Sequence, residues 1–207
     1  MIVTRIEEVN QKKIRVFIDH EFAFVLYKGE LRKYHILEGS TLEEKLYREI
    51  LQEVLPKRAK LRCLNLLKAR PYTEKQLKDK LREGEYGQAL IEEAVAYVKS
   101  YGYIDDRKYA SDYLSSYGQY RSRRRIEQEL LTKGVAKEII REIFDRMEEA
   151  GEETDELAMA VKLLEKKNYH PDTASFKEKQ KLSAFLYRKG FTSETIRTAL
   201  SLDITSN

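Results

Sequence analysis

Apolar and polar residues alternate near the start of the chain, and a longer period replaces this pattern further on. The alternating apolar positions are Ile14, Val16, Ile18, Phe22, Phe24 and Leu26. A period of two around a short polar break predicts an antiparallel hairpin. The break, Asp19-His20-Glu21, lacks glycine, so we expect Asp19 or His20 at positive φ. Residues 2–9 are a candidate third strand, and residues 1–27 are interpreted as a small β-element.

A helix is expected next. Residues 40–43, Ser-Thr-Leu-Glu, have the form of a capping box, and apolar residues follow at intervals of four. Those positions are Leu42, Leu46, Ile50 and Val54. Pro56 is expected to end this helix, because proline lacks the backbone N–H and clashes with the preceding turn. The chain beyond it is predicted to be helical, with further N-cap signals at Thr73 and Ser175.

Five large apolar positions occur three times with the same internal spacing, at offsets of 49 and 56 residues. The sets are Leu77, Leu81, Tyr86, Ile91 and Val95; Ile126, Leu130, Val135, Ile140 and Phe144; and Leu182, Leu186, Phe191, Ile196 and Leu200. Gly134 and Gly190 each precede a third member and are placed to end a helix, whereas Gly84 lies one residue off this register. Further helical stretches precede the sets, at 58–69, 106–117 and 155–167.

The repeat predicts three units of three helices each. Such units bury their apolar faces by stacking, so the expected fold class is mainly α, with tandem three-helix repeats in an elongated, curved stack. Residues 148–156, centred on Gly151, are the expected flexible joint. The predicted domains are 1–56, a β-hairpin element with a capped leading helix; 57–104, repeat 1; 105–150, repeat 2; and 151–207, repeat 3.

The fraction of charged residues and their distribution along the chain add to this prediction. The 207 residues are 36% charged, above the usual quarter, and carry a net charge of only +4. The high charged fraction favours an extended, repeat-built shape. Segments 57–82 and 107–125 are strongly basic, whereas 142–156 holds eight acids against Arg146. This separation suggests a basic working surface and a solvated acidic hinge.

Arginines gather at 121–125. Gly118 is expected to break the preceding helix and place them at the start of the next, where cations oppose the helix dipole. Arginine also pairs bidentately with phosphate, so binding is favoured over a merely solvated loop. The lysines of repeat 1 are a less specific candidate. The candidate binding residues are Arg121, Arg123, Arg124, Arg125, Lys133, Lys68, Arg70, Lys75, Lys78, Lys80 and Arg82.

Several tyrosines lie near these cations. Three of them recur every four residues, Tyr109, Tyr113 and Tyr117. They are candidates for stacking on bases, but the spacing is better explained as the core stripe of a helix. Tyr101 and Tyr103 flank Gly102 and are expected to pack between helices. Around them a C-cap glycine, the apolar Ile104 and an N-cap aspartate form a joint between repeats 1 and 2.

The sequence offers no residues for catalysis, a cofactor or a metal. Its three histidines are scattered, and Cys63 is the only cysteine, which is expected to be a small buried side chain in a reduced compartment. No phosphate-binding glycine loop or nucleophile–base arrangement is visible. No apolar run reaches the ~20 residues of a membrane span, and the N-terminus is unlike a signal peptide. We expect a soluble, cytoplasmic, monomeric binding protein.

Several strings, in this order, resemble the RecX family of bacterial recombination regulators. Residues 67–77 are similar to the family's first-unit pattern, and 102–106 followed by Tyr109-Ala110 to the joint into its second unit. Residues 125–130, with 133–135, are similar to its second-unit core. The N-terminal hairpin and capped helix resemble the extension of longer members. The resemblance therefore covers essentially the whole chain.

The resemblance implies a regulatory protein without catalytic activity. It would bind the RecA filament on single-stranded DNA and inhibit RecA ATPase, strand exchange and co-protease activity, and so act in DNA repair, homologous recombination and the SOS response. Direct contact with DNA is left open. One alternative is a stand-alone DNA-binding helical-repeat protein. Another is a general scaffold of the tetratricopeptide kind, whose period of about 34 residues does not match these offsets.

Overall fold

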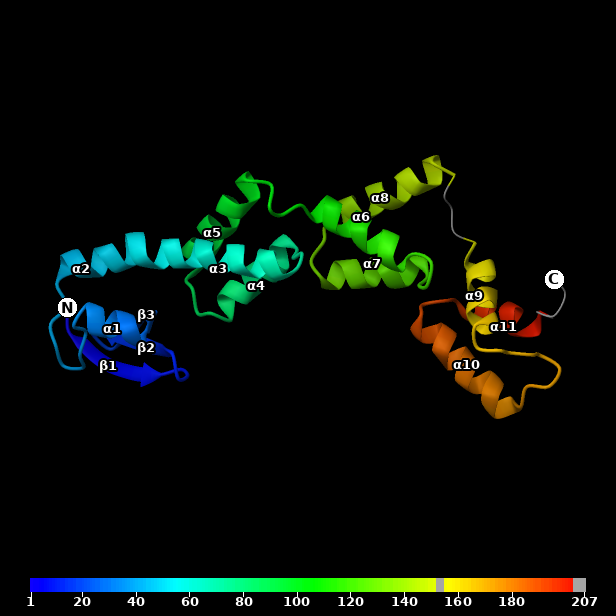
Figure 1. Ribbon diagram of the computed structural model, residues 1–207, viewed down its shortest axis with the longest axis horizontal. Coiled ribbons are helices and arrows are strands. Elements are labelled where there is room, and N and C mark those ends of the chain that lie inside the picture. The colour runs from blue at the N-terminus through cyan, green and yellow to red at the C-terminus, as the bar shows by residue number, and fades with distance from the viewer. Residues whose placement is uncertain (152–154, 203–207) are drawn as a thin grey trace. The chain divides into compact units, whose positions relative to one another are not determined.

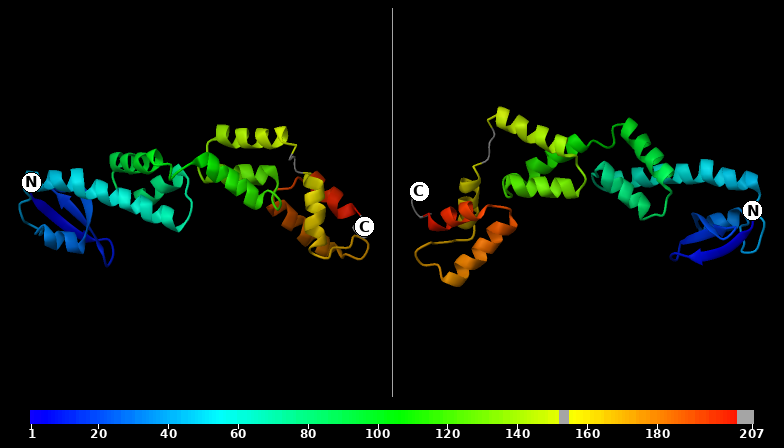
Figure 2. Two further views of the ribbon diagram at one scale, coloured as in Figure 1. Left: turned by 45° about the horizontal axis from the view of Figure 1, so that its top comes forward. Right: turned by 180° about the vertical axis from the view of Figure 1, so that it is seen from behind.

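The computed structural model describes residues 1–151 and 155–202, and its contacts divide the chain into two compact units, Met1–Ile104 and Asp105–Asn207. The chain is mainly helical with one small sheet near its N-terminus, as predicted (Figure 1; Figure 2 gives two further views). None of the described helices combines the length and the apolar character that a membrane crossing requires.

The N-terminal sheet has three antiparallel strands in the order β1 (Val3–Glu8), β2 (Lys13–Ile18) and β3 (Glu21–Tyr27). The predicted hairpin and its third strand are therefore confirmed. Both turn residues have positive φ, 48° at Asp19 and 72° at His20, as a tight two-residue hairpin turn without glycine requires.

One face of this sheet builds the first hydrophobic core. Alternation buries Val16 and Leu26 completely, and they pack with residues of the following helices. Those helices are α1 (Lys28–Lys33), α2 (Glu44–Glu49), the π-helical turn η1 (Ile50–Val54) and α3 (Leu55–Ala69).

Two predictions for the leading helix are wrong. Ser40 does not cap it: the Ser40 hydroxyl donates to the Leu37 carbonyl at 2.6 Å, and α2 starts only at Glu44. Pro56 does not end it, since η1 leads directly into α3. In η1 the Leu55 N–H bonds to Ile50, five residues back. This wider turn relieves the clash between the Pro56 ring and the preceding turn, so the helical path continues.

Three three-helix repeats follow, and each has a core of its own. Every position of the predicted fivefold pattern is buried in one of these cores or packed against it. The helices are α3, α4 (Glu74–Arg82) and α5 (Gln88–Ser100) in repeat 1; α6 (Asp106–Tyr117), α7 (Arg123–Thr132) and α8 (Lys137–Glu149) in repeat 2; and α9 (Glu156–Glu165), α10 (Phe176–Arg188) and α11 (Ser193–Ser201) in repeat 3.

The predicted helix ends are largely confirmed. Thr73 forms a capping box with Gln76, and the Ser175 hydroxyl accepts a backbone N–H three residues on. Gly134 and Gly190 follow the ends of α7 and α10 with φ of 89° and 96°. At the matching place of repeat 1 the residue with positive φ is Glu85, at 60°, which explains why Gly84 is off register.

The expected joint at 148–156 includes residues 152–154, which lie outside the described residues. The predicted domain boundaries stay predictions.

Candidate functional site

The arginine cluster of repeat 2 lies at the start of α7, as expected. Gly118 is the C-cap of α6, and Ser122 is the N-cap of α7. Ser122 is buried: its hydroxyl accepts the Arg125 N–H at 3.3 Å, and its own N–H donates to the Lys189 carbonyl at 3.1 Å. The turn after α10 therefore holds the loop in place.

Glu129 on α7 neutralises two of the arginines. Its carboxylate pairs with Arg121 and accepts the Arg125 Nε–H at 2.7 Å and the Tyr113 hydroxyl at 2.7 Å. The carboxylate is mostly buried, and desolvation alone would raise its pKa. Hydrogen bonds from Tyr113 and Arg121 outweigh that effect and hold the pKa of Glu129 below its ordinary value. Burial, then the bond to Glu129, raises the pKa of Tyr113 to about 12.

The other two arginines differ from each other. Arg123 pairs with Glu127 at 3.0 Å and also with Glu148 of α8. Arg124 is exposed and has no ion pair among the described residues. Of the four arginines, Arg124 is therefore the one whose charge no carboxylate of the described chain neutralises.

The prediction that three tyrosines of α6 form its core stripe is confirmed in part: Tyr109 and Tyr113 are partly buried and pack against the core of repeat 2, whereas Tyr117 is 37% exposed. The buried residues of α6 are Ala110 and Leu114. The tyrosines stand beside them as a partly exposed row, with successive ring centroids 6.4 and 4.6 Å apart, at Tyr109, Tyr113 and Tyr117. Cations lie over two of these rings. The Arg121 guanidinium is 4.2 Å from the centroid of the Tyr117 ring, and the Lys133 amine is 5.3 Å from the centroid of the Tyr113 ring. Tyr113, Tyr117, Arg121 and Lys133 are among the residues that line a polar groove of about 770 Å³.

The tyrosines before α6 also differ from the prediction. Tyr101 and Tyr103 are 62% and 57% exposed and stack on each other, with centroids 6.1 Å apart, instead of packing between helices. The rest of the joint is as predicted. Gly102 has φ of 70°, Ile104 is buried, and Asp105 caps α6 by accepting two backbone N–H groups.

The predicted cations of repeat 1 are mostly neutralised within the repeat. The ion pairs span 2.6 to 3.0 Å and are Lys75–Asp79, Lys78–Glu74, Lys78–Glu92, Lys80–Glu83 and Arg82–Asp79. The Arg70 guanidinium lies 4.0 Å above the Tyr72 ring. Lys68 is exposed and has no ion pair among the described residues.

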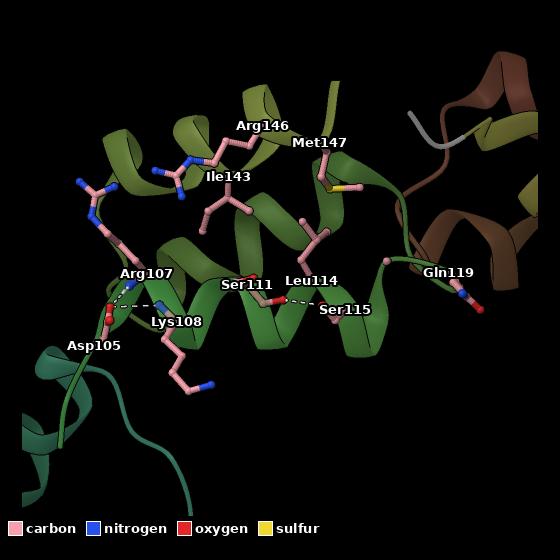
Figure 3. A pocket seen from close by; sticks show the side chains of 11 residues that line it. Asp105, Arg107, Lys108, Ser111, Leu114, Ser115, Gln119, Ile143, Arg146 and Met147 are labelled. Carbon is pink, nitrogen blue, oxygen red and sulfur yellow. Dashed lines mark hydrogen bonds between the residues drawn. The ribbon is translucent and has the colours of Figure 1, made fainter. Parts of the chain in front are cut away.

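Repeat 2 has a second groove, of about 720 Å³, between α6 and α8 (Figure 3). Leu114, Ile143 and Met147 form its apolar wall, while Lys108 and Arg146 stand at its rim (Figure 3). An apolar wall with a cationic rim suits an apolar side chain that has a carboxylate nearby.

Family comparisons agree with this architecture. Three family models match the chain in order: the first three-helix domain of RecX at residues 59–97, the second at 105–143 and the third at 153–200. The regulatory protein RecX of Caldanaerobacter subterraneus subsp. tengcongensis is 36% identical over 204 residues, which cover 98% of this chain and all of that protein. This chain belongs to the RecX family.

Other RecX proteins match over similar lengths. The regulatory protein RecX of Clostridium beijerinckii is 27% identical over 209 residues and covers 99% of this chain and 97% of its own length. A crystal structure of regulatory protein RecX matches with a TM-score of 0.57 at 23% identity, covering 96% of this chain and 98% of that chain. The RecX fold thus extends over nearly the whole sequence.

Sequence reasoning missed the α6–α8 groove of this RecX chain, although a signal for it exists. Helix α8 carries the expected buried stripe, Ile140 and Phe144. A second apolar stripe lies beside it at intervals of four, at Ile139, Ile143 and Met147, and is only partly buried. Two stripes on one helix of a three-helix unit indicate more apolar surface than its core uses.

Proposed function

We propose that this chain binds the RecA filament on single-stranded DNA and inhibits RecA ATPase, strand exchange and co-protease activity, without catalysing a reaction itself. The observation that carries the proposal is the ordered match of all three RecX three-helix domains, together with the full-length relative named a regulatory protein. Since RecA acts on chromosomal DNA, the proposal places the protein in the cytoplasm.

The repeats suit a target that is itself periodic. Each repeat has its own core and its own exposed side chains, so several weak contacts on successive repeats add through effective concentration. Among the candidate site residues, Arg124 and Lys68 support the proposal best. Contacts through Arg121, Arg125 or Lys78 would first have to replace an internal ion pair.

RecA-dependent ATP hydrolysis on single-stranded DNA tests the proposal. Titrating the full chain into preformed filaments is expected to lower the rate, and the chain is expected to sediment with filaments. An unchanged rate across the titration contradicts the proposal. If, in addition, the chain shifts DNA alone tightly at physiological salt, the stand-alone DNA-binding alternative replaces it.

A further inference from the structure

Repeat 3 differs from the other repeats in how its charges are paired. In repeats 1 and 2 most basic side chains have a carboxylate within 4.0 Å. Within the described residues 155–202 no basic side chain has one. These unneutralised cations are Lys162, Lys166, Lys167, Lys177, Lys179, Lys181, Arg188, Lys189 and Arg197. Cations without internal partners repel one another, so they do not serve stability and remain available to an external anion.

Three of these cations converge on one groove. The groove lies between α10 and α11 and has a volume of about 690 Å³. Lys179 and Arg188 line it from α10, and Arg197 lines it from α11. The buried Ile196 forms part of its floor, and the remaining lining is mainly small or polar, with Gln180, Ser183, Ala184, Ser193, Leu200 and Ser201 beside Tyr187.

Two aromatic rings stand exposed on the same face of α10. Phe176 is 82% exposed and Tyr187 is 68% exposed. Helical periodicity places positions 176, 180, 183 and 187 in one stripe, and the last three of these line the groove. The two positions are therefore about 16 Å apart along the helix axis. Neither is needed by the core of repeat 3, since neither belongs to its buried cluster.

We propose that the α10–α11 face of repeat 3 binds single-stranded DNA directly, with Lys179, Arg188 and Arg197 on phosphates and with Phe176 and Tyr187 stacked on bases. An unneutralised cationic groove with separated exposed aromatics is the combination that single-strand binding uses. A protein partner held by apolar contact would need a continuous apolar patch, whereas polar residues separate these rings. The inference deepens the proposed function and rests on it in one respect: the proposed function identifies the bound strand as the single-stranded DNA inside the RecA filament.

Binding of the full chain to a fluorescein-labelled oligothymidylate, measured by anisotropy without RecA at several salt concentrations, tests the inference. Arg188→Gln with Arg197→Gln is expected to weaken binding at least tenfold. The slope of log affinity against log salt should fall by about 1.4, at about 0.7 per lost phosphate contact. Tyr187→Ala is expected to weaken binding roughly 5- to 150-fold and leave the slope unchanged, because stacking releases no counterions.

A matched control removes the same charge elsewhere. Arg32 and Lys45 are exposed and have no ion pair among the described residues, so Arg32→Gln with Lys45→Gln should leave oligothymidylate binding within twofold of the unmodified chain. An equal loss of oligothymidylate affinity in this control would mean that binding depends on net charge alone, and it would overturn the inference. Affinity for a duplex competitor equal to that for the single strand overturns the stacking role of the aromatic residues.

RecA ATPase and filament co-sedimentation, run on the same variants, separate this inference from the proposed function. If the unmodified chain inhibits RecA but does not bind the oligothymidylate, the proposed function stands and this inference fails. If the repeat 3 variants lose filament binding while oligothymidylate binding is unchanged, the face contacts protein, and the inference is again overturned. Oligothymidylate binding without any effect on RecA removes the proposed function but leaves the DNA-binding face.

Discussion

Glu129 determines how the arginine cluster of repeat 2 behaves. Its carboxylate lies four residues after Arg125, pairs with Arg121, and accepts the Tyr113 hydroxyl. What looks like a free cationic loop in the sequence is therefore in part an internal network. Only Arg124 among the four arginines has no carboxylate partner in the described chain.

Replacing Glu129 with glutamine is expected to destabilise the fold by roughly 1–3 kcal/mol, since it leaves partly buried donors on Tyr113 and Arg121 poorly matched. Urea unfolding followed by circular dichroism measures this. Glu127→Gln is the matched control, because its more exposed pair with Arg123 should contribute less than about 1 kcal/mol. Equal losses in the two variants would contradict a special role for Glu129.

The same network predicts a pH dependence. The pKa of Glu129 is lowered in the folded state from an ordinary value of 4.5, so its stabilising effect is complete above that value. The effect is lost as the pH falls below 4.5 and through the lower folded-state pKa. The stability difference between the unmodified chain and Glu129→Gln should shrink over the pH range below 4.5. A difference that stays constant over this range would rule out this carboxylate as the titrating group.

Charge reversal separates binding from folding within the cluster. Arg124→Glu should leave the urea midpoint unchanged and weaken filament co-sedimentation, since Arg124 is exposed and without an ion pair in the described chain. Arg121→Glu should lower the midpoint, because it places a second carboxylate beside Glu129. If Arg124→Glu binds filaments normally, this loop does not belong to the contact surface.

At the scale of helices and strands, periodicity predicts more than local charge counts do. The spacing of Leu77, Ile126 and Leu182 with their companions is enough to identify three cores, because helical packing demands large apolar residues at fixed intervals. The end of a helix at Pro56 is not predictable in this way, since the rule assumes α geometry and the chain adopts a π turn there.

The candidate site was harder to predict for a related reason. Counting basic residues in blocks ignores acids four positions away, such as Glu129 for Arg125, and acids on neighbouring helices, such as Glu92 for Lys78. Lys179 and Arg188 have no acid three or four positions away. That local test would have directed attention to repeat 3. Acidic partners on neighbouring helices, however, can be identified only once the fold is known.

The turn after α10 offers a prediction at this scale. Gly190 has φ of 96°, and a Cβ there would lie 2.5 Å from both the Ser122 Oγ and the Arg125 Cβ. Gly190→Ala should therefore lower the free energy of unfolding by more than Gly102→Ala. Gly102 is the matched control, since it also has positive φ, at 70°, but no atom within 4 Å of its Cβ position. Backbone strain from positive φ alone costs about 1–2 kcal/mol in both variants. An equal loss of unfolding free energy in the two variants, measured by urea titration, would contradict the close contact at Gly190.

At the scale of the whole molecule, the cores are separate. The sheet core and the core of repeat 1 lie entirely within Met1–Ile104, and those of repeats 2 and 3 within Asp105–Asn207. Arg15 of the sheet also pairs with Glu85 of repeat 1 at 2.6 Å, which joins two cores of the first unit.

A fragment ending at residue 104 is therefore expected to fold alone, because no buried residue of its two cores is supplied from beyond it. Circular dichroism and urea titration of the fragment measure this, and a cooperative transition is the expected result. A non-cooperative transition would show that its cores depend on the second unit.

Repeat 2 depends on repeat 3 through the buried Ser122. Lys189 supplies the carbonyl that accepts the Ser122 N–H, so a chain shortened before repeat 3 leaves that amide and the helix cap beside it open to water. Deletion experiments on this protein would then confuse two effects. Loss of activity on removing the C-terminal part would report a disordered arginine loop as readily as a missing contact surface.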